Sequence, residues 1–304
     1  MSTSAAPVGR FAPSPTGPLH AGSLVPALAS YLHVRAQGGR WLLRLDDLDA
    51  QRCRGPWRDL ILRQLEQLGL RWDGPVLCQS QRTAYYREVL DRLIATGRVY
   101  ACSCSRAAVQ RRGLPLALDG APLYDGLCRA QIVSTPAQAQ GRKLHIRLDG
   151  DFRCDDAVCG SFAGVHGRHT GDFAIVERSG RVTYHLATVA DDHASAVTQV
   201  VRGADLLGCT PRQQALYAAL GWPQPLYAHV PLVRATDGTK LSKQTGARAL
   251  SCLPTDGEIW DALSVLGQQP PVGLRGAPHG QLLDWAIAHW SLVRVPVSPW
   301  SHAA

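Results

Sequence analysis

The sequence predicts an α/β fold built on an open, mostly parallel sheet. Residues 8–12 form a short, largely apolar run, a turn rich in proline and glycine follows, and apolar residues recur at helical spacing from Gly22. Two further runs of mostly apolar residues, 41–46 and 197–201, each continue into charged residues. The carboxyl ends of strands border the ligand crevice of such a sheet, so these charged residues are candidate site residues.

Length and composition indicate a soluble globular protein of one or two domains. The chain has 304 residues, of which 45% are apolar and 18% are charged. No apolar run approaches the ~20 residues of a membrane span, and no basic segment leads into an apolar one at the amino terminus. We therefore expect a cytoplasmic protein with no membrane partner. In such a protein the nine cysteines are thiols or metal ligands rather than disulfides.

The charge balance favours a polyanionic partner, although a merely basic enzyme would show it too. The formal net charge is +8 and the pI is about 9.2. Only three of the 32 lysine and arginine residues are lysine, and two of these, Lys240 and Lys243, fall in one short motif. An ammonium group is a compact point charge that can follow a moving phosphate, whereas guanidinium is planar and larger. The clustering indicates that chemistry keeps these two lysines in place.

The first turn and helix carry a candidate anion site. One face of the helix is apolar and should pack in the core: Leu24, Leu28, Tyr31 and Leu32. His20, Gly22 and Ser23 lie at the amino end of this helix, where backbone N–H groups favour an anion such as a phosphate. An ordinary strand-to-helix turn remains the alternative for this segment alone.

The strand at 41–46 runs into an acidic cluster at Asp46, Asp47 and Asp49. The cluster could hold a substrate ammonium, or it could be a solvated turn that caps the next helix. We predict that helix at 56–68 and another at 82–96, from their apolar spacing.

Residues 100–128 form an insertion that carries a candidate zinc site. Cys102 and Cys104 are close enough to share one ion, and Cys128 stands at the far end of the same insertion. A structural zinc site needs four ligands, and the local candidates for the fourth are Tyr124, Asp119 and Asp125. The alternative is a set of inert buried thiols.

The second half alternates strands and helices. We predict strands from alternating or β-branched residues at 143–148, 173–176, 182–184 and 197–201. We predict helices from Tyr184 onward and at 213–220, 256–266 and 280–291.

Residues 239–244, Thr-Lys-Leu-Ser-Lys-Gln, are a second candidate phosphate-binding element. Together with His-x-Gly at 20–22, they resemble the two signatures of class I aminoacyl-tRNA synthetases. The sequence at 10–23 resembles the glutamyl/glutaminyl branch; it reads Arg-Phe-Ala-Pro-Ser-Pro-Thr-Gly-x-Leu-His-x-Gly-Ser. Residues 184–207, with Tyr-x-Leu-Ala, Asp-Asp and Val-Arg-Gly-x-Asp-Leu-Leu, resemble the glutamyl family closely.

This resemblance implies a Rossmann-like, doubly wound parallel sheet with an insertion. The catalytic domain would comprise two halves, 1–99 and 171–250, and the second half would carry the lysine loop. An inserted zinc-binding, acceptor-like subdomain would span 100–170, and a short helical C-terminal region would span 251–304.

The resemblance also implies the chemistry of carboxylate activation by ATP with Mg²⁺. The implied glutamate-binding residues are Arg10, Phe11, Ala12, Pro13, Ser14, Asp46, Tyr184 and Arg202. The implied ATP-binding residues are His20, Gly22, Lys240, Ser242 and Lys243, of which His20 and Lys243 would be catalytic. Arg10, at the end of the first strand, would supply the cation that a glutamate side chain needs. The family usually has glutamate where this chain has Asp46, which is one methylene shorter.

The insertion and the tail resemble the glutamyl-queuosine tRNA(Asp) synthetases in particular. In that group Tyr-x₃-Cys closes the zinc loop, which implies one structural zinc on Cys102, Cys104, Tyr124 and Cys128. The stretch that follows Gln244 is shorter than the anticodon-binding domains of a full glutamyl-tRNA synthetase need. The implied partners are ATP, L-glutamate and tRNA(Asp) bearing queuosine, with glutamyl-AMP formed without tRNA by a monomer.

Three other functions remain open at this point. The chain could be a shortened glutamyl-tRNA synthetase that charges the 3′ end of tRNA(Glu). It could be a nucleotidyltransferase of the same fold, or a non-catalytic RNA-binding module. Lys240 and Lys243 argue against a non-catalytic RNA-binding module, because a protein that only binds RNA would not need this lysine pair.

Overall fold

The computed structural model describes residues 6–233, 249–250 and 257–298. One parallel sheet in this part of the chain has the order β1-β2-β3. Its strands are Val8–Phe11 (β1), Arg40–Leu45 (β2) and Leu77–Cys78 (β3). A second sheet has the order β7-β6-β10-β9, and only the hairpin β6–β7 is antiparallel. Its strands are Asp151–Asp156 (β6), Gly160–Val165 (β7), Gln199–Gly203 (β9) and Leu226–Val230 (β10).

The two sheets adjoin where β1 lies beside β9. The backbone N–H of Thr198 donates to the carbonyl of Val8 across 2.9 Å. Read as one sheet, the order is β3-β2-β1-β9-β10-β6-β7, and the direction of winding reverses between β1 and β9. Ligands bind at such a reversal in doubly wound folds, so the predicted Rossmann-like architecture is confirmed and its crevice is located.

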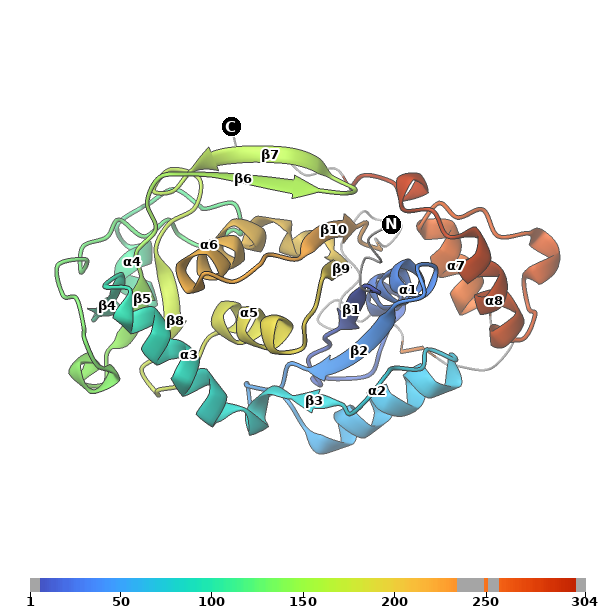
Figure 1. Cartoon of the computed structure of the whole chain (residues 1–304), viewed down its shortest axis with the longest axis horizontal. Coiled ribbons are helices and arrows are strands. Elements are labelled where there is room, and N and C mark those ends of the chain that lie inside the picture. The colour runs from blue at the N-terminus through green and yellow to red at the C-terminus, as the bar shows by residue number, and fades with distance from the viewer. Residues whose placement is uncertain (1–5, 234–248, 251–256, 299–304) are drawn as a thin grey trace.

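Helices cover both faces of this sheet (Figure 1). The helices on one face are Ala21–Arg35 (α1) and Gly55–Gln67 (α2). Those on the other face are Thr83–Ala95 (α3), Tyr184–Ala194 (α5) and Thr210–Leu220 (α6). Gly9 allows α1 to approach β1, because a side chain there would meet Val34 Cγ1 at 2.7 Å.

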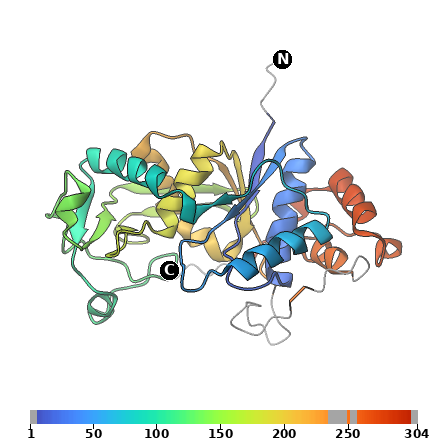
Figure 2. The ribbon, with the colours of Figure 1, turned by 90° about the horizontal axis from the view of Figure 1, so that it is seen from below.

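A third, antiparallel sheet of order β4-β5-β8 lies at one end of the molecule. It comprises Val99–Cys102 (β4), Lys143–Ile146 (β5) and Phe173–Val176 (β8), with the short helix Arg106–Gln110 (α4) beside it. Two helices at the other end, Glu258–Val265 (α7) and His279–His289 (α8), pack on α1 (Figure 2). Short 3₁₀ helices complete the described part: Gln79–Gln81, Pro136–Ala139, Ala204–Cys209 (η3), Val272–Leu274 and Leu292–Arg294.

Most predicted elements are found within a few residues of their expected bounds, but one predicted strand is wrong, and β3, β4, α4, β10 and a hairpin were not predicted. The predicted strand at 182–184 is wrong, because Val182 makes only a single bridge to Val176 and Tyr184 already begins α5. Thr183 is extended only because it precedes the helix as its N-cap. The hairpin of β6 and β7 has no counterpart among the predicted elements. In the described residues, no helix combines the length and apolar character needed to cross a bilayer.

Candidate functional site

A cavity of about 580 Å³ opens at the carboxyl ends of β1 and β9, beside the amino end of α1. Most residues predicted to bind glutamate or ATP line it together: Arg10, Phe11, Ala12, Ser14, His20, Gly22, Asp46, Tyr184 and Arg202. Pro13 is not part of the lining, and its carbonyl instead accepts a hydrogen bond from the Asp46 backbone N–H (3.1 Å). Segments that are far apart in the sequence therefore meet at the switch point of the sheet.

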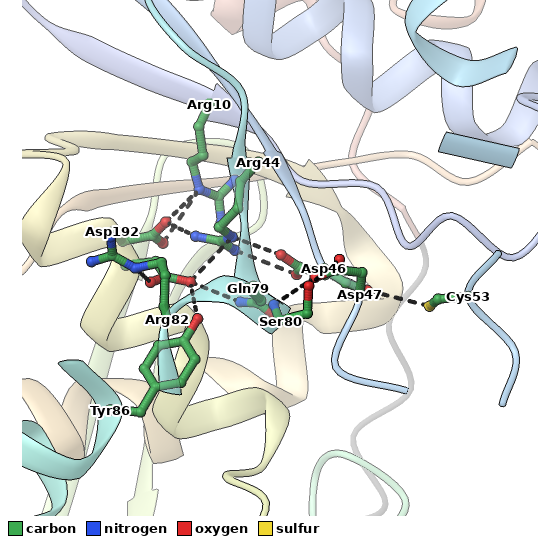
Figure 3. A network of polar contacts seen from close by, with 11 residues as sticks. Arg10, Arg44, Asp46, Asp47, Cys53, Gln79, Ser80, Arg82, Tyr86 and Asp192 are labelled. Carbon is green, nitrogen blue, oxygen red and sulfur yellow. Dashed lines mark hydrogen bonds and ion pairs between the residues drawn. The ribbon is translucent and has the colours of Figure 1, made fainter. Parts of the chain in front are cut away.

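Arg10 is buried and held from below by Asp192 of α5 (Figure 3). Its Nε lies 3.1 and 3.3 Å from the two carboxylate oxygens, and Arg44 Nη1 lies 2.5 Å from Oδ1. Burial alone would raise the pKa of Asp192, but the two guanidinium groups hold it below its usual value. Within the described chain no hydrogen bond engages the Nη groups of Arg10, so they remain able to bind an anion in the cavity.

Asp46 lies in the cavity wall, but its carboxylate is already engaged by Arg44 (Figure 3). Arg44 Nε lies 2.6 Å from Asp46 Oδ1, and the side chains of Arg44 and Asp46 are 5% and 9% exposed. Burial raises the pKa of Asp46, and the Arg44 charge opposes that shift. The shorter side chain is thus held toward β2. Among the described residues, its second oxygen has a single, longer contact with Arg44 Nη2 (3.4 Å), so it can still face a cation.

A second layer of polar contacts supports the first. Asp191 accepts hydrogen bonds from Tyr86 Oη (2.7 Å), Gln79 Nε2 (2.9 Å) and Arg82 Nε (2.7 Å). Burial raises the pKa of Asp191, while Arg44 and these donors work against the rise. This layer ties α3 and the segment between β3 and α3 to α5, so the arginines above it rest on a rigid support.

Arg202 enters the cavity from the end of β9 and is almost fully buried. Its donors contact His229 Nε2 (2.9 Å), Gln213 Oε1 (2.7 Å) and Thr210 Oγ1 (3.0 Å). Tyr184, the first residue of α5, lies in the same wall, and burial raises the pKa of its phenol. The site therefore brings Arg10, Arg202 and a neutral tyrosine to one cavity, whose lining also includes Arg44 and Arg52.

His20 stands at the amino end of α1, as predicted, and is 9% exposed. Its backbone N–H donates to Ser23 Oγ (2.8 Å), and it forms an isolated bridge with Ala249. The predicted residues Lys240, Ser242 and Lys243 lie outside the described residues. The described residues on either side of that segment, Leu232 and Ala249, both lie at this end of α1.

The four predicted metal ligands meet at one point in the insertion. Tyr124 Oη lies 3.5 Å from Cys102 Sγ and 3.6 Å from Cys104 Sγ, and Cys104 Sγ lies 3.8 Å from Cys128 Sγ. A tetrahedral zinc with ordinary bond lengths has edges of about 3.8 Å between sulfurs and about 3.5 Å between sulfur and oxygen. Burial would raise the pKa of Cys128, but hydrogen bonds led by that with Tyr124 lower it to about 7. The cluster could hold a metal ion.

Of the three candidates for a fourth ligand, only Tyr124 points at the thiols. Asp125 is ion-paired with Arg112 at 2.8 Å, and Asp119 is ion-paired with Arg212. Of the candidates that spacing alone left open, the two aspartates are therefore engaged by arginines, and Tyr124 is the one beside the thiols.

Sequence reasoning missed the residues that hold the site together. It gave no functional role to Asp192, Asp191, His229 or Asp156, although all four are buried and polar. For the two carboxylates in α5 a signal existed, because adjacent aspartates inside an otherwise apolar helix need buried partners. Asp156 gave no such signal, because it alternates with exposed charged residues in β6.

The comparisons with known proteins agree with this geometry. A family model described as tRNA synthetases class I (E and Q), catalytic domain, matches residues 8–259. The chain is 48% identical over 296 residues to a glutamyl-Q tRNA(Asp) synthetase of Thiobacillus denitrificans, covering 97% of each chain. It is 45% identical over 288 residues to one of Methylococcus capsulatus, covering 95% of this chain and 92% of the relative.

Solved structures show the same similarity at the level of the fold. A glutamate tRNA ligase from Elizabethkingia meningosepticum, solved in complex with its amino acid, superposes with a TM-score of 0.77 at 26% identity. The match covers 97% of this chain and 67% of the ligase. A methionyl-tRNA synthetase from Mycobacterium tuberculosis superposes with a TM-score of 0.53 at 11% identity, which shows a shared fold only.

Proposed function

Since this chain belongs to the class I glutamyl/glutaminyl tRNA synthetase family, within its glutamyl-Q tRNA(Asp) synthetases, we propose that it is a ligase acting on glutamate. It activates L-glutamate with ATP to glutamyl-AMP and transfers the glutamyl group to the queuosine base of tRNA(Asp). The observation that carries the proposal is the joint placement of Arg10, Arg202, Tyr184 and His20 around one cavity at the switch point.

In this proposal the two arginines select the amino acid. Arg10 and Arg202 face the side-chain carboxylate of glutamate, and Tyr184 supports it. Asp46 meets the α-ammonium. The adjoining wall comes from the end of β1 and the turn after it, with Phe11, Ala12 and Ser14 in the lining and Pro13 outside it. Glutamine would leave a buried guanidinium without its counter-charge, so discrimination against it is expected to be large.

ATP lies across the amino end of α1. An oxygen of the glutamate α-carboxylate attacks the α-phosphorus, and the bond from that phosphorus to the bridging oxygen of pyrophosphate breaks. His20 and the N–H groups near Gly22 neutralise the triphosphate from one side, because helix amino ends favour anions. Lys240, Ser242 and Lys243 act from the lysine motif, and Mg²⁺ accompanies the nucleotide.

A zinc ion bound by Cys102, Cys104, Tyr124 and Cys128 would be structural. The sulfur and oxygen separations match the edges of a tetrahedron, which supports zinc over inert thiols. The ion would tie β4 to the loop at 124–128 and would take no part in the reaction.

The resemblance to the family also supports a division of the chain into four parts, 1–99, 100–170, 171–250 and 251–304. It supports a cytoplasmic location and a monomeric state as well.

The test uses labelled glutamate and ATP with tRNA(Asp) and tRNA(Glu), each with and without queuosine. The proposal expects pyrophosphate exchange with glutamate alone and acid-precipitable label on tRNA(Asp) only when queuosine is present. Label on the 3′ end of tRNA(Glu) would favour a shortened glutamyl-tRNA synthetase. Exchange that strictly required tRNA would contradict tRNA-independent activation, and nucleotide transfer without glutamate would favour a nucleotidyltransferase.

A further inference from the structure

Arg202 is held by a chain of buried side chains that begins in the unpredicted hairpin. Arg202 Nε donates to His229 Nε2 across 2.9 Å, and His229 Nδ1 lies 2.6 Å from Asp156 Oδ2. Arg202 and His229 are register partners on β9 and β10, and Asp156 is the last residue of β6. All three are at most 7% exposed. The carboxylate of the hairpin therefore acts on Arg202 through one imidazole.

The neighbours of His229 dictate which nitrogen carries its proton. Arginine can only donate hydrogen bonds, so His229 Nε2 must accept and carries no proton. The proton is then on Nδ1, which faces the acceptor oxygen of Asp156. Burial lowers the pKa of His229 to about 4, so the ring is neutral at pH 7. One neutral tautomer fits this site.

Asp156 is itself fixed by backbone contacts. Its Oδ1 accepts hydrogen bonds from the N–H groups of Cys159 (2.8 Å), Val158 (3.0 Å) and His229 (3.2 Å). Burial would raise the pKa of this carboxyl, but His229 and these N–H groups keep it below its usual value. Asp156 is therefore an anion of fixed orientation, suited to orient a neighbour rather than to react.

The remaining contacts of Arg202 leave it little freedom. Nη1 donates to Gln213, and Nη2 donates to Thr210 Oγ1 and to the carbonyl of Leu206 (3.3 Å). A guanidinium has five N–H donors. With Nε used by His229, one Nη1 N–H has no partner in the described chain, and Arg202 borders the cavity. The orientation of the whole group decides where that last donor points.

We propose that Asp156 and His229 are positioning residues that set the orientation of Arg202 toward the substrate's side-chain carboxylate. The inference rests on the proposed function and deepens it, because it gives the hairpin β6–β7 a role in amino-acid selection. Without the imidazole acceptor, the Nε–H of Arg202 is buried unpaired, and the guanidinium turns to find another partner. Glutamate binding then weakens, while the phosphate chemistry at the other end of the cavity is unaffected.

The experiment measures glutamate-dependent pyrophosphate exchange in Asp156→Asn, His229→Leu and His229→Gln. We expect the KM for glutamate to rise about tenfold to hundredfold in Asp156→Asn and His229→Leu. The KM for ATP and kcat should change little. His229→Gln places an amide oxygen near the former Nε2, so its KM should rise less. Asp155→Asn is the matched control, because Asp155 is the adjacent residue of β6 and its side chain is 67% exposed.

Two results would overturn the proposal. One is a KM for glutamate in Asp156→Asn and His229→Leu no higher than in Asp155→Asn. The other is an equal KM in His229→Gln and His229→Leu, a comparison that decides the matter should Asp156→Asn fail to fold. If the unaltered protein shows no exchange with glutamate, the proposed function fails instead. Nitrogen-15 NMR of the histidines then decides separately, since the proposal requires the His229 proton on Nδ1, and a proton found on Nε2 would overturn it.

Discussion

Replacing Asp192 by asparagine tests the ion-pair support beneath the cavity. Asp192 contacts Arg10 Nε at 3.1 Å and Arg44 Nη1 at 2.5 Å, and all three side chains are at most 5% exposed. Arg44 keeps Asp46 as a partner after the substitution, but Arg10 has no second ion-paired carboxylate in the described chain. The substitution therefore leaves one buried guanidinium uncompensated.

The expected loss follows from this contact pattern. Removing one partner of a buried ion pair costs about 3–5 kcal/mol, because the remaining charge stays buried without compensation. The asparagine oxygen can still accept one hydrogen bond from an arginine, and Arg44 retains a counter-charge. We therefore expect the free energy of unfolding to fall by about 3 kcal/mol, at the lower end of that range.

Urea unfolding at neutral pH, followed by tryptophan fluorescence, measures this loss. The matched control is Asp261→Asn, because Asp261 pairs with Arg275 at 3.2 Å but both side chains are more than half exposed. An exposed pair of this kind contributes about 0–1 kcal/mol. A loss in Asp192→Asn no greater than in the control would refute the argument that burial makes this pair indispensable.

Three further predictions concern the nucleotide, the metal and pH. Lys243→Ala should lower the rate of pyrophosphate exchange at least about hundredfold while leaving glutamate binding unchanged in calorimetry, because in the proposed mechanism its ammonium meets charge that develops only in the transition state. Cys128→Ser should lower the zinc content measured by atomic emission, whereas Cys78→Ser, at a cysteine outside the cluster, should leave it unchanged. His185 has its pKa lowered to about 3 by burial and then by nearby arginines. As the pH falls, His185 therefore takes up a proton at a higher pH in the unfolded chain than in the folded protein. The free energy of unfolding should fall below pH 6.5, by on the order of 2 kcal/mol by pH 5. His185→Asn should flatten that decline in urea titrations, and an unchanged slope would count against it.

The first half of the sheet could be predicted because its signals are local. All three signals fall within residues 8–35: the apolar run, the Pro/Gly turn and the helical spacing of α1. The folded protein keeps the strand and the helix that these local signals favour. The resemblance then placed Arg10, Tyr184 and Arg202 together, and they do line one cavity. The cysteine cluster was predictable for the same reason, since its members all lie between Cys102 and Cys128.

The partners of the supporting carboxylates could not be predicted, because they are distant in sequence. Asp192 meets Arg10 across 182 positions, and Asp156 meets His229 across 73. In β6, exposed charges at Asp151, Arg153 and Asp155 make the strand look like a solvated loop. A local rule assigns an aspartate in such a segment to the surface, and only the three-dimensional partner reverses that assignment.

Arg10 and Arg202 are each oriented by a carboxylate from an element outside their own strand. Arg10 is fixed by Asp192 of α5, and Arg202 is fixed through His229 by Asp156 of β6. In each case the supporting contact uses Nε, which leaves both Nη groups of Arg10 and one Nη1 N–H of Arg202 without a partner in the described chain. Because the donors are oriented before the ligand arrives, little side-chain entropy is lost when a carboxylate binds. Under the proposed function, a substrate without that negative charge cannot use these oriented donors, so we expect the supporting residues to contribute to glutamate selectivity together with the arginines.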